Sequence, residues 1–231
     1  MAEPNAPEHF SEWNEQMVAR HDPELFHNHP RWIVRSIENS RVNTVLSLLN
    51  AGPSHVVLEL GCGGGNVLER SSGGKKYALD LSQRMSQRAL KRLGRKASIV
   101  RADGESIPFR DGSVDRVICS SVLSHALHPQ QLLLESYRVL KPGGRLVVSV
   151  STEASIERGL KIARTLGLNR ILLGRSPDKP QEDVYNREYH LHRFDAESLR
   201  DAASKLPPAR KLKAVRSFFF PVHLVALFVK D

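Results

Sequence analysis

The fold of this chain is decided by the stretch Val56-Val57-Leu58-Glu59-Leu60-Gly61-Cys62-Gly63-Gly64-Gly65-Asn66. Its aliphatic run, 56–60, ends abruptly in glycines, which is typical of a buried strand that turns sharply into a helix. Glycine adopts positive φ angles without strain and lets a ligand approach the backbone closely. The helix that follows directs its unpaired N–H groups toward that ligand. The stretch predicts a nucleotide-like ligand at this turn, with a tight turn that binds nothing as the alternative.

The spacing of the glycines distinguishes between ligands. The dinucleotide fingerprint G-x-G-x-x-G would require a glycine at position 66, where this chain has Asn66. The chain instead has Gly61, Gly63 and Gly65, with Glu59 two residues before the first of them. A carboxylate at that place repels a pyrophosphate and suits a ligand that carries an ammonium group. S-adenosylmethionine is such a ligand, because it carries an ammonium group and a cationic sulfonium.

Composition favours a single α/β protein in a reducing compartment. At 231 residues the chain is long enough for one α/β domain with additional elements. Two cysteines, Cys62 and Cys119, do not make a disulfide framework. The N-terminus lacks the features of a signal peptide, and the longest apolar run, 218–229, is shorter than the roughly 20 residues of a membrane-spanning helix. We therefore expect a cytoplasmic protein without a transmembrane segment.

The net charge of +9 is concentrated in one segment. Residues 75–101 contain nine basic side chains and one acidic side chain. Four arginines recur at three- and four-residue spacing along the basic helix predicted within 82–96, on the face opposite its apolar residues. Such a row is typical of the solvated face of a helix that covers a sheet, and it also fits contact with RNA or an anionic membrane surface. These residues are Arg84, Arg88, Arg92 and Arg95.

Strand and helix signals alternate from residue 51 onward. The pattern predicts strands at 56–60, 76–80, 98–101, 114–120 and 145–150, and helices at 82–93 and 130–140. Near-continuous apolar strands are typical of a parallel sheet that is covered on both faces. Two further runs, 212–220 and 223–229, leave no room for a crossover helix and should pair antiparallel. The sequence predicts an α/β, Rossmann-like, doubly wound fold with a seven-stranded sheet, mostly parallel with an antiparallel terminal hairpin strand.

Two regions lie outside this alternation. Residues 1–50 are predicted to form an N-terminal helical cap, with an amphipathic helix over 31–49. Residues 151–193 contain a helix-like segment, 156–172, and a polar stretch. We interpret them as an insertion over the carboxyl ends of the strands, where open α/β sheets bind ligands.

Five motifs follow one another along the chain: Glu59-Leu60-Gly61-Cys62-Gly63-Gly64-Gly65, Ala78–Met85, Arg101–Phe109, Ser113–Ser120 and Arg138–Leu146. In this order they resemble the class I S-adenosylmethionine-dependent methyltransferases, most closely the small-molecule subgroup that contains ubiquinone and menaquinone C-methyltransferases. The resemblance covers residues 56–150 well and the two terminal strands loosely. It implies that residues 51–231 form a methyltransferase domain and that S-adenosyl-L-methionine is the cofactor.

The same resemblance assigns the residues that bind the cofactor. Asp80 ends a strand about 20 residues after the glycines, where a carboxylate accepts hydrogen bonds from ribose hydroxyls. The resemblance implies that Asp103 accepts from the adenine amino group, that the backbone near Gly104 meets the ring, and that Ser120 lies beneath the methionine moiety. The predicted set is Glu59, Gly61, Gly63, Gly65, Asp80, Asp103, Gly104 and Ser120.

Methyl transfer requires above all that the nucleophile, the methyl carbon and the sulfur be aligned. A general base is needed only if the acceptor must lose a proton. His125 lies where this subgroup often has a histidine that faces the acceptor, so it is the candidate base, with packing inside its loop as the alternative. The histidines near the N-terminus lack the spacing of a metal site, and we predict no metal.

Three functions remain open at this point. The leading hypothesis is in-line methyl transfer to a small or lipid-like acceptor. An RNA methyltransferase that uses the basic surface at 75–101 is one alternative, although no aromatic RNA-binding motif accompanies that surface. A non-catalytic scaffold that binds the cofactor is another, and the intact Glu59, Asp80 and Asp103 disfavour it. The basic helix at 82–96 is the candidate contact with an anionic surface.

Overall fold

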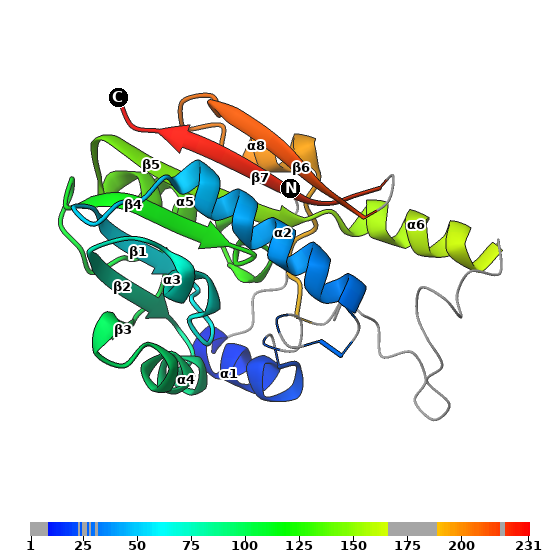
Figure 1. Cartoon of the computed structure of the whole chain (residues 1–231), viewed down its shortest axis with the longest axis horizontal. Helices are drawn as coiled ribbons and strands as arrows, with labels where there is room; N and C mark the ends of the chain where they lie inside the picture. The colour runs from blue at the N-terminus through cyan, green and yellow to red at the C-terminus, as the bar shows by residue number, and fades with distance from the viewer. Residues whose placement is uncertain are drawn as a thin grey trace.

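The described strands form one seven-stranded sheet in the order β3-β2-β1-β4-β5-β7-β6 (Figure 1). This computed structural model describes residues 9–22, 24, 27, 29, 30, 32–165, 189–217 and 220–231. The strands are β1 (Val56–Leu60), β2 (Lys75–Asp80), β3 (Ser98–Arg101), β4 (Val114–Ser120), β5 (Leu140–Ser151), β6 (Lys211–Ser217) and β7 (Phe220–Val229).

The first five strands pair in parallel, and β7 runs antiparallel to both of its neighbours, β5 and β6. Only two residues separate β6 from β7, so the chain must reverse there and cannot make the crossover that a parallel pair needs. The predicted Rossmann-like, mostly parallel sheet with an antiparallel terminal hairpin strand is confirmed.

Helices cover both faces of the sheet (Figure 1). α5 (Pro129–Arg138) and α8 (Ala196–Ala202) pack on one face, and α2 (Trp32–Leu49), α3 (Asn66–Arg70) and α4 (Gln83–Leu93) pack on the other. α1 (Phe10–Arg20) lies against α4, and α6 (Glu153–Thr165) follows β5 directly. Two short 3₁₀ turns, Gly94–Lys96 and Leu123–His125, follow α4 and β4. The carboxyl ends of β1, β2 and β4 are left accessible to a ligand.

α2 is part of the same hydrophobic core as the central strands. Val42, Val45 and Leu49 are fully buried and cluster with Val57 of β1 and Ile118 of β4. Full burial of such side chains contributes roughly 1.5–3 kcal/mol each. The helix predicted over 31–49 therefore covers the sheet. Its N-terminal half lies beside the carboxyl ends of the central strands.

Several predicted boundaries are wrong by a few residues. β5 begins at Leu140 and not at 145, because the Gly143 N–H donates to the Lys230 carbonyl (2.8 Å) and the Lys230 N–H donates to that of Gly144 (3.0 Å). Gly143 and Gly144 are therefore paired with Lys230, directly after the end of β7. α5 spans 129–138 because Pro129 is suited to the first helical turn. The helix predicted at 156–172 begins at Glu153, and its residues 166–172 lie outside the described residues.

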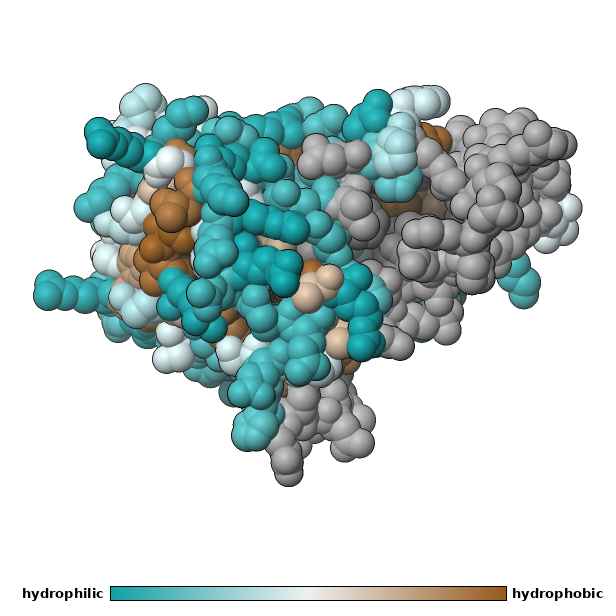
Figure 2. Space-filling view, turned by 90° about the horizontal axis from the view of Figure 1, so that it is seen from below, coloured by the Kyte–Doolittle hydropathy of each residue, from teal (hydrophilic) through white to brown (hydrophobic). Residues whose placement is uncertain are grey.

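The basic helix has the predicted faces. In α4, Met85, Ala89 and Leu93 are buried, and Ser82 caps the helix because its hydroxyl accepts from the Met85 N–H (3.2 Å). Hydrophilic residues cover most of the described surface on the side where α1 and α4 lie (Figure 2). Within the described parts of the chain, no helix is long and apolar enough to cross a membrane.

Candidate active site

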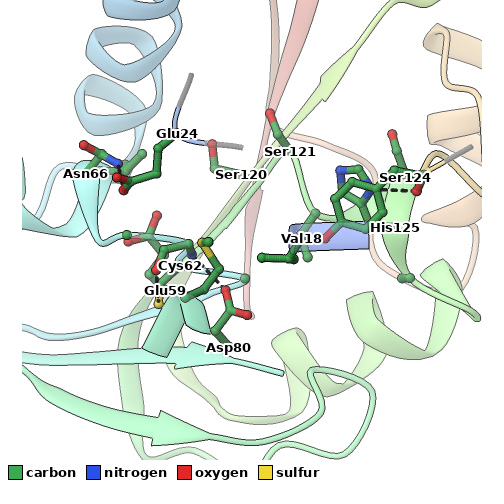
Figure 3. A pocket seen from close by; sticks show the side chains of 18 of the residues that line it. Val18, Glu24, Glu59, Cys62, Asn66, Asp80, Ser120, Ser121, Ser124 and His125 are labelled. Atoms are coloured by element: carbon green, nitrogen blue, oxygen red, sulfur yellow. Dashed lines mark hydrogen bonds between the residues drawn. The ribbon is translucent and has the colours of Figure 1, made fainter. Parts of the chain in front are cut away.

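A cavity of about 310 Å³ lies at the carboxyl ends of β1, β2 and β4. One side, which we call the strand wall, consists of residues 59, 61–64, 66–67, 79–81, 103–105, 120–122 and 124–126, which lie at or just after the ends of these strands and β3. The other side, which we call the cover, consists of residues from α1 and the first half of α2, together with His21, Asp22, Glu24, His27, Tyr189 and His190. Figure 3 shows Glu24 and Asn66 at one end of the pocket and Ser124 and His125 at the other, with Ser120 and Ser121 between them.

The glycine turn is shaped by three left-handed residues. Gly61, Gly63 and Gly65 have φ angles of +58°, +52° and +82°. A Cβ on Gly61 would lie 2.5 Å from a methyl of Val122, and one on Gly65 would lie 2.9 Å from Leu93. A Cβ on Gly63 would meet no atom within 4 Å. Gly61 therefore serves close packing and Gly63 faces open space, whereas Gly65 packs against α4 and does not line the cavity.

Asp80 links the glycine turn to the start of α4. Its Oδ2 accepts from the Gly63 N–H (2.8 Å), and its Oδ1 accepts from the Ser82 N–H (2.9 Å). The side chain is buried, and this burial raises the pKa of Asp80 to about 6. Each carboxylate oxygen keeps a second lone pair, so Asp80 can still accept from hydroxyl groups in the cavity.

Glu59 lies beneath the turn and supports α3. The N-cap of this helix is Gly65, which has no side chain to cap it, and Glu59 Oε2 accepts from the Leu68 N–H (3.0 Å) instead. Glu59 is 2% exposed, and burial raises the pKa of its carboxyl to about 8. The carboxyl group is therefore largely protonated at neutral pH until a cation comes close to it.

The remaining predicted cofactor residues lie farther along the strand wall. Asp103 Oδ1 accepts from the Glu105 N–H (2.9 Å), which holds the loop after β3 in a turn. Gly104 faces α5, and a Cβ there would lie 3.2 Å from Leu132. Ser120 ends β4, and its hydroxyl lies 2.9 Å from that of Ser149. All three line the same cavity as Asp80.

A buried ion pair in α2 is a feature that the sequence prediction missed. Arg41 Nε donates to Glu38 Oε2 (2.9 Å), and Arg41 Nη1 donates to the Ser149 hydroxyl (3.1 Å) and to that of Ser120. Burial alone would raise the pKa of Glu38, but the charge and hydrogen bonds of Arg41 lower it to about 2. The signal was available, because Glu38 and Arg41 fall on the apolar stripe that continues through Val42 and Val45.

The N-terminal segment reaches the glycine turn and the basic helix. Glu24 Oε1 accepts from Asn66 Nδ2 (2.9 Å) and lies where a Cβ on Gly64 would be, 1.4 Å from that point. On α4, Arg88 donates to Asp22 (2.6 Å), and Arg92 lies 3.5 Å from Glu24. Two of the four arginines in the basic row are therefore paired with the segment that covers the pocket.

The predicted base, His125, lies in the 3₁₀ turn after β4 and lines the cavity. Its Nδ1–H donates to the Tyr189 carbonyl (2.9 Å), since a carbonyl can only accept. The ring centroid of His125 lies 4.0 Å from that of Tyr189 and 4.7 Å from that of His190. Burial, and then the adjacent His190, lower the pKa of His125 to about 3. His125 is therefore neutral near pH 7.

Comparisons with known proteins agree with the motifs. Residues 58–148 match the family model described as a methyltransferase domain. The chain is 37% identical over 118 residues to a malonyl-[acyl-carrier protein] O-methyltransferase of Marinomonas sp., a match that spans 48% of this chain and 44% of that protein. It is 31% identical over 115 residues to a ubiquinone/menaquinone biosynthesis C-methyltransferase of Ruegeria sp., spanning 46% of each. The chain thus spans less than half the length of these two curated relatives.

A solved structure of similar fold is the N-methyltransferase NodS from Bradyrhizobium japonicum in complex with S-adenosyl-L-homocysteine. Its TM-score is 0.64, over 96% of this chain and 98% of that one, at 19% identity. The resemblance to S-adenosylmethionine-dependent methyltransferases is confirmed. The three names include O-, C- and N-methylation, so they do not indicate which atom is methylated here.

Proposed function

We propose that this chain, whose residues 58–148 belong to the methyltransferase domain family, transfers a methyl group from S-adenosyl-L-methionine to a small or lipid-like acceptor. The observation that carries the proposal is the open space beside Gly63, bordered by the Asp80 carboxylate that is bonded to the Gly63 N–H. A backbone without a side chain and an adjacent carboxylate suit the close approach of a ribose.

The residues of the strand wall fit the cofactor along its whole length. Asp80 would accept from the ribose hydroxyls, and Asp103 and Gly104 would meet the adenine. Glu59 and Ser120 would meet the methionine end, where an ammonium group would favour the ionised form of Glu59. When bound, the cofactor supplies an electrophilic methyl group on a sulfonium. The cavity volume lies within the range of roughly 300–1,000 Å³ for small-molecule sites.

The cover is the part of the chain that we assign to the acceptor. The cap over residues 1–50 contributes Asn14, Val18 and Glu38 to the cavity, and the insertion over 151–193 contributes Tyr189 and His190. Together they exclude water and hold the acceptor in line with the methyl carbon, which is the main requirement of the reaction. Both curated relatives are named for carrier-bound or quinone substrates, which supports a small or lipid-like acceptor here.

The donor site is tested by replacing Asp80. We expect Asp80→Asn to weaken binding of S-adenosylhomocysteine roughly ten- to hundredfold in calorimetry, because hydrogen bonds to a charged group contribute about 1.5–3 kcal/mol. Asp201→Asn, an exposed aspartate of α8, is the matched control. Wild-type protein without affinity for the compound, or unchanged affinity in Asp80→Asn, would contradict the proposal.

The reaction itself is tested with a radioactive methyl donor and fractionated cell extract. Label in a small-molecule or lipid fraction, identified by mass spectrometry, is the expected result. Label that appears only in RNA would favour the RNA alternative, and donor binding without any product would favour a non-catalytic scaffold.

A further inference from the structure

Five of the described histidines line the cavity, and one of them, His190, has a carboxylate behind it. His190 Nδ1 lies 2.5 Å from Oε1 of Glu153, the first residue of α6. The Glu153 side chain is 3% exposed, and its other oxygen accepts from Arg193 Nε (2.9 Å). Burial would raise the pKa of Glu153, but the hydrogen bond and charge of His190, and then Arg193, lower it. Glu153 is therefore a buried carboxylate in its ionised form.

The partner of Nδ1 fixes where the proton of His190 lies. An ionised carboxylate only accepts, so Nδ1 of His190 carries the hydrogen and Nε2 of the neutral ring keeps its lone pair. His190 lines the cavity and its side chain is 16% exposed. A histidine that lines a pocket with one nitrogen held by a buried carboxylate is arranged to take a proton at the other nitrogen.

His125 and His190, two of the five described histidines that line the cavity, differ in the group that their Nδ1 contacts. His125 bonds to a neutral carbonyl, whereas His190 bonds to a carboxylate. Their ring centroids are 4.7 Å apart, so a charge on one disfavours a charge on the other. Within the described residues, Glu153 contacts His190, and Arg193 in turn is paired with Glu153. Of these two rings, His190 is therefore the one whose contacts suit a proton acceptor.

The segment that carries His190 is held firmly over the strand wall. The N–H groups of Leu191 and His192 both donate to the Ser124 carbonyl (2.8 and 3.2 Å), in the turn that contains His125. The Tyr189 hydroxyl donates to Asn14 of α1 (3.1 Å). His190 is thus fixed from three elements of the chain, as a group that must meet a substrate should be.

We propose that His190 is the catalytic proton acceptor of the methyl transfer, with Glu153 as its positioning residue, and that the acceptor molecule is methylated on an atom that loses a proton. This inference rests on the proposed function. A bond forms between the acceptor atom and the methyl carbon, and the carbon–sulfur bond of the donor breaks with its electron pair going to sulfur. The proton of the acceptor atom passes to Nε2 of His190. The substrate class is therefore a hydroxyl, a phenol, an amine N–H or an acidic C–H, and not a thioether or a tertiary amine.

The first test needs no knowledge of the acceptor. In the full chain labelled with ¹⁵N-histidine and saturated with S-adenosylhomocysteine, His190 is assigned by the signals lost in His190→Gln. We expect the neutral ring to be protonated at Nδ1 and bare at Nε2, and Glu153→Met to shift it toward the Nε2–H form. A proton on Nε2 in the wild type, or no change in Glu153→Met, would overturn the proposal.

The second test measures methyl transfer into the extract fraction that the wild type labels. We expect His190→Gln to lower the rate roughly a hundredfold or more, the usual range for loss of a general base, and His125→Gln to lower it less than about tenfold. The Kd for S-adenosylhomocysteine should stay within about threefold of the wild-type value, which is a change of less than about 0.7 kcal/mol in the free energy of binding. His192→Gln is the control, because that ring bonds to the Leu127 carbonyl (3.2 Å) and does not line the cavity.

The two proposals fail in different ways. Loss of donor binding in the wild type would contradict the proposed function, whatever the state of His190. Intact donor binding with transfer that is insensitive to His190→Gln would overturn only the proton acceptor. A product methylated on an atom that had no proton to lose would do the same. If Glu153→Met does not fold, His190→Gln and the product still decide.

Discussion

The carboxyl groups on the two sides of the pocket have pKa values that are shifted in opposite directions. On the strand wall, Glu59 and Asp80 accept from backbone N–H groups, and burial raises their pKa values to about 8 and about 6. Neither forms an ion pair within the described residues. On the cover, Glu38 is paired with Arg41, and Glu153, behind the cover, is paired with Arg193 and His190. The strand wall contains no lysine or arginine side chain that would compete with a cationic ligand. In the cover and behind it, the carboxylates are already paired with arginine or histidine.

Replacing Arg41, which neutralises Glu38 in the cover, should give the largest loss of stability. Arg41→Met leaves Glu38 buried without its partner and breaks the bonds from α2 to Ser120 and Ser149. We expect the free energy of unfolding to fall by about 3–5 kcal/mol in denaturant titrations. The double variant Glu38→Met/Arg41→Met should regain most of this loss, because it removes the unpaired charge. A single variant as stable as the wild type would show that the pair does not hold the cover to the sheet.

The glycine turn allows a comparison within the strand wall itself. Gly61→Ala combines a φ of +58° with a contact of 2.5 Å to Val122, and we expect a loss of about 2–4 kcal/mol in unfolding free energy. Gly64→Ala meets only the end of the flexible Glu24 side chain, which can move aside, so its cost should stay below about 1 kcal/mol. Equal losses in thermal or chemical unfolding would contradict this assignment.

Glu59 should make donor binding dependent on pH. Because its pKa is raised to about 8 in the free protein, binding of an ammonium group to its ionised form must release a proton at lower pH. We expect the affinity for S-adenosylhomocysteine to rise roughly ten- to hundredfold between about pH 6 and pH 8, as measured by calorimetry. Glu59→Gln should lose most of this rise.

Glu59 should affect the stability of the free protein in the opposite direction, because its ionisation lowers the free energy of unfolding as the pH rises. A carboxyl whose pKa is raised on folding contributes stability at low pH, and that contribution is lost as the pH rises toward about 8. The free energy of unfolding of Glu59→Gln should therefore fall less steeply than that of the wild type between about pH 5 and pH 8. An unchanged slope would show that Glu59 does not titrate in this range.

The strand wall was largely predictable from the sequence, and the cover was not. The residues from Glu59 to Asn66 and Asp80 lie at strand ends, so their positions follow from short-range patterns of glycines and apolar runs. Glu153 and His190 are 37 residues apart and meet only because α6 begins where β5 ends. Periodicity predicts the helix that carries Glu38 and Arg41, but not the serines on β4 and β5 to which Arg41 donates. Contacts of this kind depend on the assembled sheet, and no local pattern encodes them.

The smallest expected effect concerns the contact between the cover and α4, where Arg88 donates to Asp22 (2.6 Å). Both side chains are about one-third exposed, so Arg88→Gln should cost no more than about 1 kcal/mol of unfolding free energy, and less in high salt. Arg95→Gln, on the exposed turn after α4, is the control and should have no measurable effect. Loss of this pair should also speed proteolysis of the segment around residue 22, because that segment holds the cover on α4. If Arg88→Gln instead lowers binding to anionic vesicles and leaves proteolysis unchanged, the basic row acts as a surface contact and does not secure the cover.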